Sequence, residues 1–202
     1  PAAVLAGAAE TLQRYRGQLD ERSEAALHEV LVRGGHRVAA VVQSLLEAGE
    51  FVERRVTAEP RCTDLSALLE EVVALRAAGA VELGPVPVVG VRVDPRLVAR
   101  ALHLLVDNVE EHATGPARLC TAVRGPDLVL TIDDQGPGIP ARWRHEVLAP
   151  FGRVPDDDHA PGVGLGLYVV AEIARLHGGH VQVGAAPGGG ARVTVELPGA
   201  AG

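Results

Sequence analysis

Two apolar seams with heptad spacing occupy the first fifty residues and constrain the fold more than any other feature of the sequence. Within residues 1–20, and again within residues 27–45, small or apolar residues recur at alternating intervals of three and four. This spacing places them on one face of a helix. The segment Gly17 to Ser23 predicts a turn, so the pattern predicts a helical hairpin. Since such a hairpin leaves one face of each helix exposed, we expect two copies to form a four-helix homodimer.

The second predicted helix contains the sequence "RGGH", Arg33 to His36. A glycine inside a helix costs about 1 kcal/mol relative to alanine. The two glycines therefore predict a bend in this helix.

Charge and composition exclude several classes of function. The net charge is −7 and no long basic run occurs, which argues against a nucleic-acid partner. No apolar run approaches the ~20 residues of a membrane span, so we expect no membrane segment in this fragment. All 19 cationic side chains are Arg, which excludes a Walker A loop and Schiff-base chemistry. Cys62 and Cys120 are isolated, which favours a reduced, cytoplasmic location.

Residues 55–202 mix helix and strand patterns without regular βαβ alternation, which predicts an α+β domain after a hairpin domain of residues 1–54. An acidic cap followed by Pro in the first turn predicts a long helix from Asp94. Alternating apolar residues predict paired strands on either side of the turn "RGPD". We expect helices at about 64–77, 94–113, 140–148 and 165–177, and strands at 117–123, 127–133, 180–183 and 191–197.

Asn108 is the only Asn of the chain and lies on the helix that starts at Asp94. Spacing of three and four residues puts it on one face with Leu104, Glu111 and His112. At the edge of the apolar stripe, its amide oxygen can meet a ligand or a hard cation. A surface Asn, or one bonded to a neighbouring loop, fits the helix equally well.

Two glycine-containing stretches could also contact a ligand. In "TIDDQGPGIP", Asp134 follows a strand and can accept hydrogen bonds from an exocyclic amine, while Gly136 and Gly138 permit close approach of a flat ring. In "GVGLGLYVV", glycines precede a helix whose N-terminus suits phosphate. This is not the dinucleotide-binding fingerprint, because the position of its third Gly is occupied by Leu167. An ordinary acidic turn and a chance cluster of glycines are the alternatives.

In their order, these segments resemble the ATP-binding domain of bacterial sensor histidine kinases, in the GHKL ATPase superfamily. "LLVDNVEEHA" resembles the N box, "DDQGPGIP" the G1 box, "APFGRV" the F box, "GVGLGL" the G2 box and "GGGARVTVELP" the terminal G3 region. The resemblance covers residues 55–198. The first hairpin is similar to the dimerisation and phosphotransfer domain of the same family.

The resemblance implies a Bergerat-type sandwich, a mixed sheet covered by helices on one face. It implies that Asn108 holds Mg²⁺ at the ATP phosphates, that Asp134 recognises the adenine amino group, and that Arg153 faces the phosphates from a mobile lid at 150–161. The implied chemistry is transfer of the γ-phosphoryl group to a histidine and then to an aspartate of a response regulator receiver domain. The complete implied nucleotide site is Asn108, Glu111, His112, Asp134, Gly136, Gly138, Ile139, Arg153, Gly162, Gly164, Leu165, Gly166 and Leu167.

The sequence departs from the family pattern in several places. The start "PAAVLAGAAETL" resembles the continuation of the phosphoacceptor motif, so we expect the acceptor His just upstream of residue 1 and a fragment that binds Mg-ATP without phosphorylating itself. His28 is the lesser alternative. Leu104 replaces the first Asn of the N box and Glu111 stands where a basic residue often faces phosphate. Two rival readings therefore remain: a degenerate, non-catalytic binding module, and another GHKL ATPase or anti-sigma-type serine kinase.

Overall fold

The computed structural model of the chain describes residues 2–53, 55–74, 79–86, 90–113, 115–155 and 163–201. The chain divides into two compact units, Pro1–Glu47 and Ala48–Gly202. The boundary lies inside a long helix, a few residues before the end of the predicted hairpin domain. None of the described helices combines the length and the apolar character that crossing a bilayer requires.

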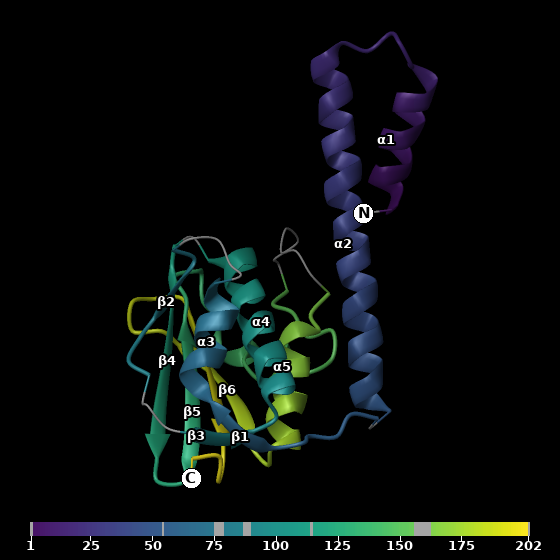
Figure 1. The fold of residues 1–202 in the computed structure, drawn as a ribbon. Coiled ribbons are helices and arrows are strands. Elements are labelled where there is room, and N and C mark those ends of the chain that lie inside the picture. The colour runs from purple at the N-terminus through teal and green to yellow at the C-terminus, as the bar shows by residue number, and fades with distance from the viewer. Residues whose placement is uncertain are drawn as a thin grey trace. The chain divides into compact units, whose positions relative to one another are not determined.

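The first unit is a helical hairpin, as the heptad seams predict (Figure 1). It consists of α1 (Ala2–Arg14) and most of α2 (Glu21–Val52). The turn between them contains Gly17 at φ 75°. Asp20 caps α2, because its Oδ1 accepts a hydrogen bond of 2.7 Å from the backbone N–H of Ser23.

Gly34 and Gly35 do not interrupt α2, which runs as one helix from Glu21 to Val52. The predicted bend within this helix stays a prediction. The two glycines differ in their surroundings. A β-carbon at Gly34 would lie 2.9 Å from Cγ of Leu5, whereas one at Gly35 would meet nothing within 4 Å. Gly34 is therefore the position where α1 packs closely against α2, and this contact offsets the low helix propensity of glycine.

The second unit contains a mixed five-stranded sheet in the order β2-β4-β5-β7-β6. The pair β2–β4 is parallel, and the other neighbouring pairs are antiparallel. A separate antiparallel pair, β1–β3, lies beside it (Figure 1). The strands are β1 (Arg61–Asp64), β2 (Val81–Leu83), β3 (Gly90–Val93), β4 (Ala117–Arg124), β5 (Asp127–Asp133), β6 (His180–Ala185) and β7 (Ala191–Leu197).

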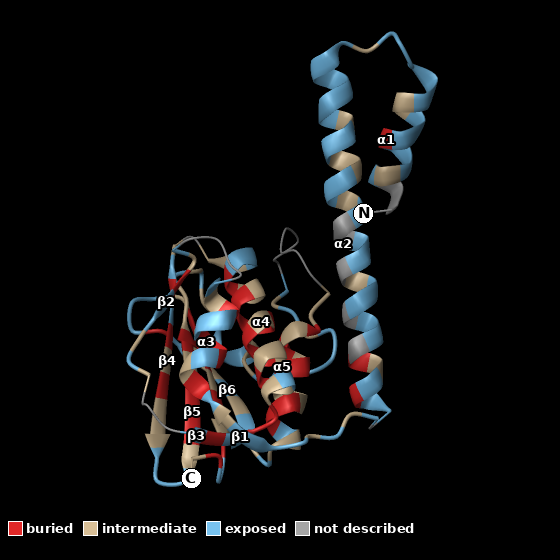
Figure 2. Ribbon diagram, in the orientation of Figure 1, coloured by how far each residue is buried: buried red, intermediate tan, exposed pale blue. Residues whose placement is uncertain are grey.

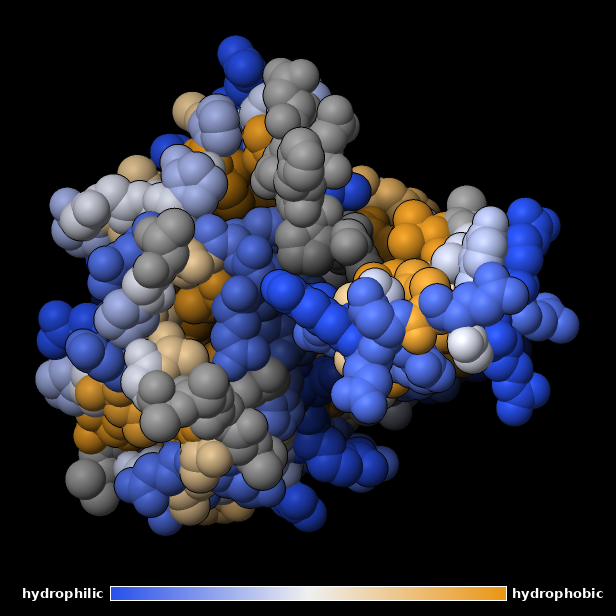
Figure 3. All heavy atoms as spheres, turned by 90° about the horizontal axis from the view of Figure 1, so that it is seen from above, coloured by the Kyte–Doolittle hydropathy of each residue, from blue (hydrophilic) through white to orange (hydrophobic). Residues whose placement is uncertain are grey.

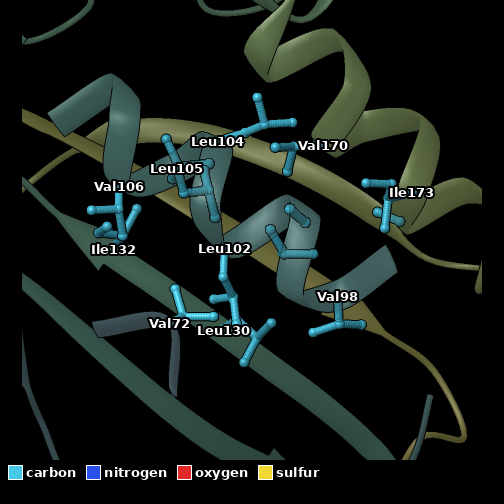
Figure 4. Packing of buried hydrophobic residues seen from close by; sticks show 14 of the residues in the cluster. Val72, Val98, Leu102, Leu104, Leu105, Val106, Leu130, Ile132, Val170 and Ile173 are labelled. Atoms are coloured by element: carbon cyan, nitrogen blue, oxygen red, sulfur yellow. The ribbon is translucent and has the colours of Figure 1, made fainter. Parts of the chain in front are cut away.

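Three helices cover one face of this sheet: α3 (Leu65–Ala74), α4 (Pro95–His112) and α5 (Gly166–Leu176). Figure 2 shows that the buried residues of the second unit gather where these helices meet the strands. In Figure 4, Leu102 points from α4 toward Leu130 on the sheet, and Leu104 points toward α5. This layered arrangement confirms the predicted α+β fold with helices on one face. The last turn of α2 adds Ala48 and Phe51 to the same core.

The segment Pro140 to Leu148 is two short 3₁₀ helices, η1 (Ala141–Trp143) and η2 (Glu146–Leu148), rather than the predicted single helix. Their bonds join residues three apart, as in the 2.9 Å bond from the N–H of Trp143 to the carbonyl of Pro140. A segment this short lacks the apolar period that stabilises an α-helix, and tight 3₁₀ turns are common in such connections. The end of the helix predicted to reach Ala77 lies outside the described residues.

Candidate functional site

Helix α4 presents Asn108 at the edge of its buried stripe. Five of the seven buried residues on α4 precede Val106, and Asn108 follows with a half-buried side chain. His112 is also half-buried, whereas Glu111 is exposed. Leu104 differs from the other members of the predicted face, because it is buried and belongs to the hydrophobic core. The C-terminal part of the helix therefore presents Asn108 together with the polar residues Asp107, Glu111 and His112.

Asp134, directly after β5, is held by the backbone on two sides. Its Oδ1 accepts hydrogen bonds from the N–H of Gly136 at 2.8 Å and from the N–H of Ala191 at 2.9 Å. Its own N–H donates to the carbonyl of Ala191 at 3.0 Å. The two bonds to Oδ1 fix the carboxylate and do not involve its second oxygen, Oδ2. A fixed carboxylate oxygen is suited to accept a hydrogen bond from a ligand amine.

Glycines bring Asp134 next to the end of α4 and the start of β7. A β-carbon at Gly136 would lie 2.8 Å from the carbonyl oxygen of His112. A β-carbon at Gly138, which has φ 74°, would lie 2.9 Å from the carbonyl oxygen of Gly190. Both positions therefore require glycine, because a side chain would collide with these carbonyl groups. The N-box-like helix, the G1-like turn and the G3-like loop meet here.

The two adjacent aspartates have different partners. Asp133 accepts two 2.6 Å hydrogen bonds from the guanidinium of Arg192 on β7. The hydrogen bond to Asp133 raises the pKa of Arg192 above its usual value. This geometry is that of a bidentate cross-strand ion pair, which stabilises the sheet. Of the two aspartates, Asp134 is therefore the one that the fold directs to the candidate site.

The start of α5 lies beside the buried Leu104. The nearest atom that a β-carbon at Gly166, the first residue of α5, would meet is Cδ2 of Leu104, at 3.9 Å. Leu165 and Leu167 are buried and anchor this turn in the core. The Leu165 side chain cannot cap the helix, so the first N–H groups of α5 receive no hydrogen bond from it. Such N–H groups attract anions.

The F-box-like segment packs against the G2-like loop. Gly164 has φ 72°, and a β-carbon there would lie 2.6 Å from the carbonyl oxygen of Gly152 and 3.0 Å from Cγ of Arg153. Phe151 has the unusual φ of 61° and an exposed ring. Arg153 is exposed beside the loop that leads into α5. Gly162 and the central part of the predicted lid, 156–161, lie outside the described residues.

The structure thus brings together two groups of predicted residues. Asp134, Gly136 and Gly138 meet the end of α4 near His112, and Ile139 packs against the core. The second group is the start of α5, with Gly164, Leu165, Gly166 and Leu167, beside Arg153. Residues that sequence reasoning missed are Gly152, Gly190 and Ala191, which shape the backbone around these groups. Their signals in the sequence were the F-box-like segment, which contains Gly152, and the G3-like segment, which contains Gly190 and Ala191.

The described residues contain no group of three or more His, Cys, Asp or Glu side chains that could hold a metal ion. The amide of Asn108 is a single oxygen donor of the kind that Mg²⁺ takes together with phosphate oxygens and water.

Comparison with known proteins identifies the same region. Residues 93–201 match the family described as histidine kinase-, DNA gyrase B-, and HSP90-like ATPase. The chain is similar to the signal transduction histidine-protein kinase AfsQ2 of Streptomyces coelicolor, with 30% identity over 90% of this chain and 34% of that protein. It is equally similar to the adaptive-response sensory kinase SasA of a Synechococcus species, with 30% identity over 98% of this chain and 55% of that protein.

Solved structures have the same fold. The histidine kinase AdeS of Acinetobacter baumannii superposes with a TM-score of 0.73 and 23% identity, over 98% of this chain and 94% of that one. The ATP-binding domain of PrrB from Mycobacterium tuberculosis gives a TM-score of 0.57 and 27% identity, over 71% of this chain and 98% of that one. The chain spans about a third of the length of AfsQ2 and about half of that of SasA.

Proposed function

The chain belongs to the family of histidine kinase-, DNA gyrase B-, and HSP90-like ATPases, and we propose that it is the ATP-binding kinase portion of a two-component sensor histidine kinase. In this proposal it binds ATP with Mg²⁺ and transfers the γ-phosphoryl group to a histidine. A response regulator receiver domain then takes the phosphoryl group on an aspartate.

The observation that carries the proposal is the position of Asp134. Two backbone N–H groups hold its Oδ1 beside the end of α4, where glycines allow the surrounding backbone segments to approach one another closely. We propose that the carboxylate accepts a hydrogen bond from the adenine amino group. Gly136, Gly138 and Ile139 would line the adenine side of the site.

The phosphates would lie between α4 and the start of α5. The uncapped N–H groups at Gly166 favour negative charge, and Arg153 can supply a positive one. Asn108 would hold Mg²⁺ through its amide oxygen, and the ion would neutralise charge on the phosphate oxygens. Phosphoryl transfer depends mainly on such positioning and charge neutralisation, so few catalytic side chains are needed. Glu111 would repel the phosphates, which makes binding depend more strongly on the cation.

The helical unit supports the proposed homodimer. Val4, Val32, Val42 and Leu46 are all about half exposed or more on the described surface of the hairpin. Figure 3 shows apolar side chains between hydrophilic ones on this unit. Burying such side chains against a second copy is favourable, at about 25 cal/mol per Å² of apolar surface. The receiver domain of the response regulator would dock on the assembled helices.

Calorimetric titration with a non-hydrolysable ATP analogue, with and without Mg²⁺, tests the proposed site. We expect Mg²⁺-dependent binding that is lost in Asn108→Ala and kept in Glu110→Ala, a control on the exposed side of the same helix. Absence of binding to the unmutated chain would contradict the proposal and favour a non-catalytic module.

Phosphoryl transfer needs a second assay, in which the chain is incubated with labelled ATP and with the phosphoacceptor domain of a sensor histidine kinase. Phosphohistidine is acid-labile, and phosphoserine is not. A label that survives acid would instead indicate the serine kinase alternative. His28 lies exposed on α2, and a label on the 202-residue chain that disappears in His28→Gln would identify it as the acceptor.

A further inference from the structure

Asp94 is a buried carboxylate that joins two separate segments. Its side chain is 1% exposed. Oδ1 accepts from the N–H of Arg96 at 3.0 Å and more weakly from that of Leu97 at 3.4 Å, which caps α4. Oδ2 accepts from the N–H of Glu59 at 3.0 Å, which lies 35 residues earlier in the segment that follows α2. The cap of α4 is thus also the attachment point of this segment.

His177 extends the same cluster to α5. Its Nε2 accepts the backbone N–H of Asp94 at 3.0 Å, and its Nδ1 lies 2.8 Å from the carbonyl oxygen of Ile173. A carbonyl can only accept, so Nδ1 carries the proton and the ring is the neutral Nδ1–H tautomer. His177 therefore binds the C-terminal end of α5 to the N-terminal end of α4.

The cluster lies at the opposite end of both helices from the proposed nucleotide site. Asn108 is in the C-terminal part of α4, and Gly166 begins α5, whereas Asp94 precedes α4 and His177 follows α5. The two helices lie side by side in Figure 1. Fixing them to each other at one end limits how far they can separate at the other. Helices are stiff enough to transmit such a constraint along their length.

We propose that Asp94 and His177 are positioning residues that hold α4 and α5 in the spacing required for nucleotide, and that they couple the segment at Glu59 to the nucleotide site. The inference rests on the proposed nucleotide site. By thermodynamic reciprocity, nucleotide that tightens α4 against α5 also strengthens the attachment of Glu59. The charged groups that face Asp94 are the guanidinium of Arg96, at 3.4 Å, and the carboxylate of Glu59, which binds the same guanidinium.

The coupling is tested by hydrogen exchange at the Glu59 amide, resolved by NMR, without nucleotide and then with a Mg²⁺-loaded non-hydrolysable ATP analogue. His177 does not touch Glu59, so His177→Ala changes this rate only if the coupling exists. We expect His177→Ala to speed exchange at Glu59 by about tenfold, because the buried N–H of Asp94 loses its acceptor and Asp94, which holds the Glu59 amide, is held less firmly. His177→Gln keeps an acceptor at the Nε2 position and should restore slow exchange. His180→Ala is the control, because His180 is exposed and lies on the neighbouring strand.

A second pair of variants separates this coupling from simple helix capping. Asp94→Asn keeps an oxygen for the cap of α4 but turns an amide donor toward the N–H of Glu59. Asp64→Asn makes the same change in the exposed cap of α3, whose Oδ1 accepts from Ser66 and Ala67. We expect Asp94→Asn alone to weaken nucleotide binding and to abolish the slowing at Glu59 by nucleotide.

The possible outcomes separate the two proposals. Exchange at Glu59 that is unchanged in His177→Ala, or insensitive to bound nucleotide, would overturn the coupling. If His177 and Glu59 are coupled in a chain that binds no nucleotide, the structural link between the two helices stands. The role of this link in the nucleotide site and the proposed function would then both be overturned. Equal losses in Asp94→Asn and Asp64→Asn would reduce Asp94 to a helix cap.

Discussion

Gly190 lies so close to Asp134 that a β-carbon built on it would stand 2.5 Å from the Oδ1 atom of that carboxylate. Gly190 also has φ 79°, a conformation that residues with a side chain rarely adopt. The loop before β7 thus determines where the carboxylate can lie. Sequence reasoning assigned the recognition of the base to Asp134, but the orientation of Asp134 depends on this loop.

Substitution of Gly190 is expected to damage the site more than substitution of its neighbour. Gly190→Ala must push Asp134 aside, so we expect nucleotide affinity to fall at least tenfold, about 1.4 kcal/mol or more. Gly188→Ala is the matched control, because a β-carbon there meets nothing within 4 Å. Calorimetric titration of both variants measures the difference. Equal affinities would mean that Asp134 does not contact the ligand.

The adjacent aspartates are expected to separate binding from stability. Asp134→Asn removes the charge but keeps the backbone bonds to Oδ1, so we expect a loss of about 1.5–3 kcal/mol in nucleotide binding, the range for hydrogen bonds to charged groups. Asp133→Asn breaks the ion pair with Arg192 and should lower the unfolding midpoint while leaving affinity nearly unchanged. Titration and urea unfolding of each variant test the two effects. A reversed pattern would exchange the roles assigned to the two residues.

The two glycines of α2 are expected to respond differently to substitution by alanine. Gly35→Ala gains helix propensity, about 1 kcal/mol, without a new contact. Gly34→Ala gains the same propensity but must displace the side chain of Leu5, so we expect it to be less stable than Gly35→Ala. Thermal unfolding followed by circular dichroism compares them. Identical stabilisation by both substitutions would show that α1 does not pack at Gly34.

Acid is expected to remove the contribution of Asp94 to stability. Burial raises the pKa of this carboxyl, but hydrogen bonds from Glu59, Arg96 and Leu97 outweigh burial and hold it below the usual value. A group whose pKa is lower in the folded state stabilises that state above its unfolded pKa, about 4. The contribution is lost as the pH falls through the lower, folded pKa.

Urea unfolding between pH 7 and pH 2 measures this effect. We expect the free energy of unfolding to fall less steeply below about pH 4 in Asp94→Asn than in the unmutated chain. Asp64→Asn serves as the control for loss of an exposed cap. If Asp94→Asn retained the full acid dependence of the unmutated chain, the carboxylate would not be held as described.

Local patterns were enough to predict most of the fold. The heptad seams, the Asp94 cap and the alternation in 117–133 each specify one element by short-range rules, and the structure confirms them. The prediction of a single helix from Pro140 was wrong, because no apolar period distinguishes a 3₁₀ turn from a short helix. The close contact at Gly34 was not predicted, because its partner, Leu5, comes from another helix.

The site was predictable to the extent that it depends on single motifs. Asp134, Gly136 and the start of α5 were predicted as site residues because each follows or precedes a recognisable element. Ala191 could not be found in this way, since its contact with Asp134 spans 57 residues and depends on the pairing of β5 with β7. The same limit applies to His177, whose ring contacts Asp94 across 83 residues.

The alternation of Asp133 and Asp134 makes correct folding a condition for any activity. Successive residues of a strand face opposite sides, so a slip of β5 by one position against β7 would move both carboxylates away from their present positions. Arg192 would then lose its partner, and the acid beside the glycines would lack the backbone bonds that orient it. A misregistered sheet would be both unstable and unable to bind.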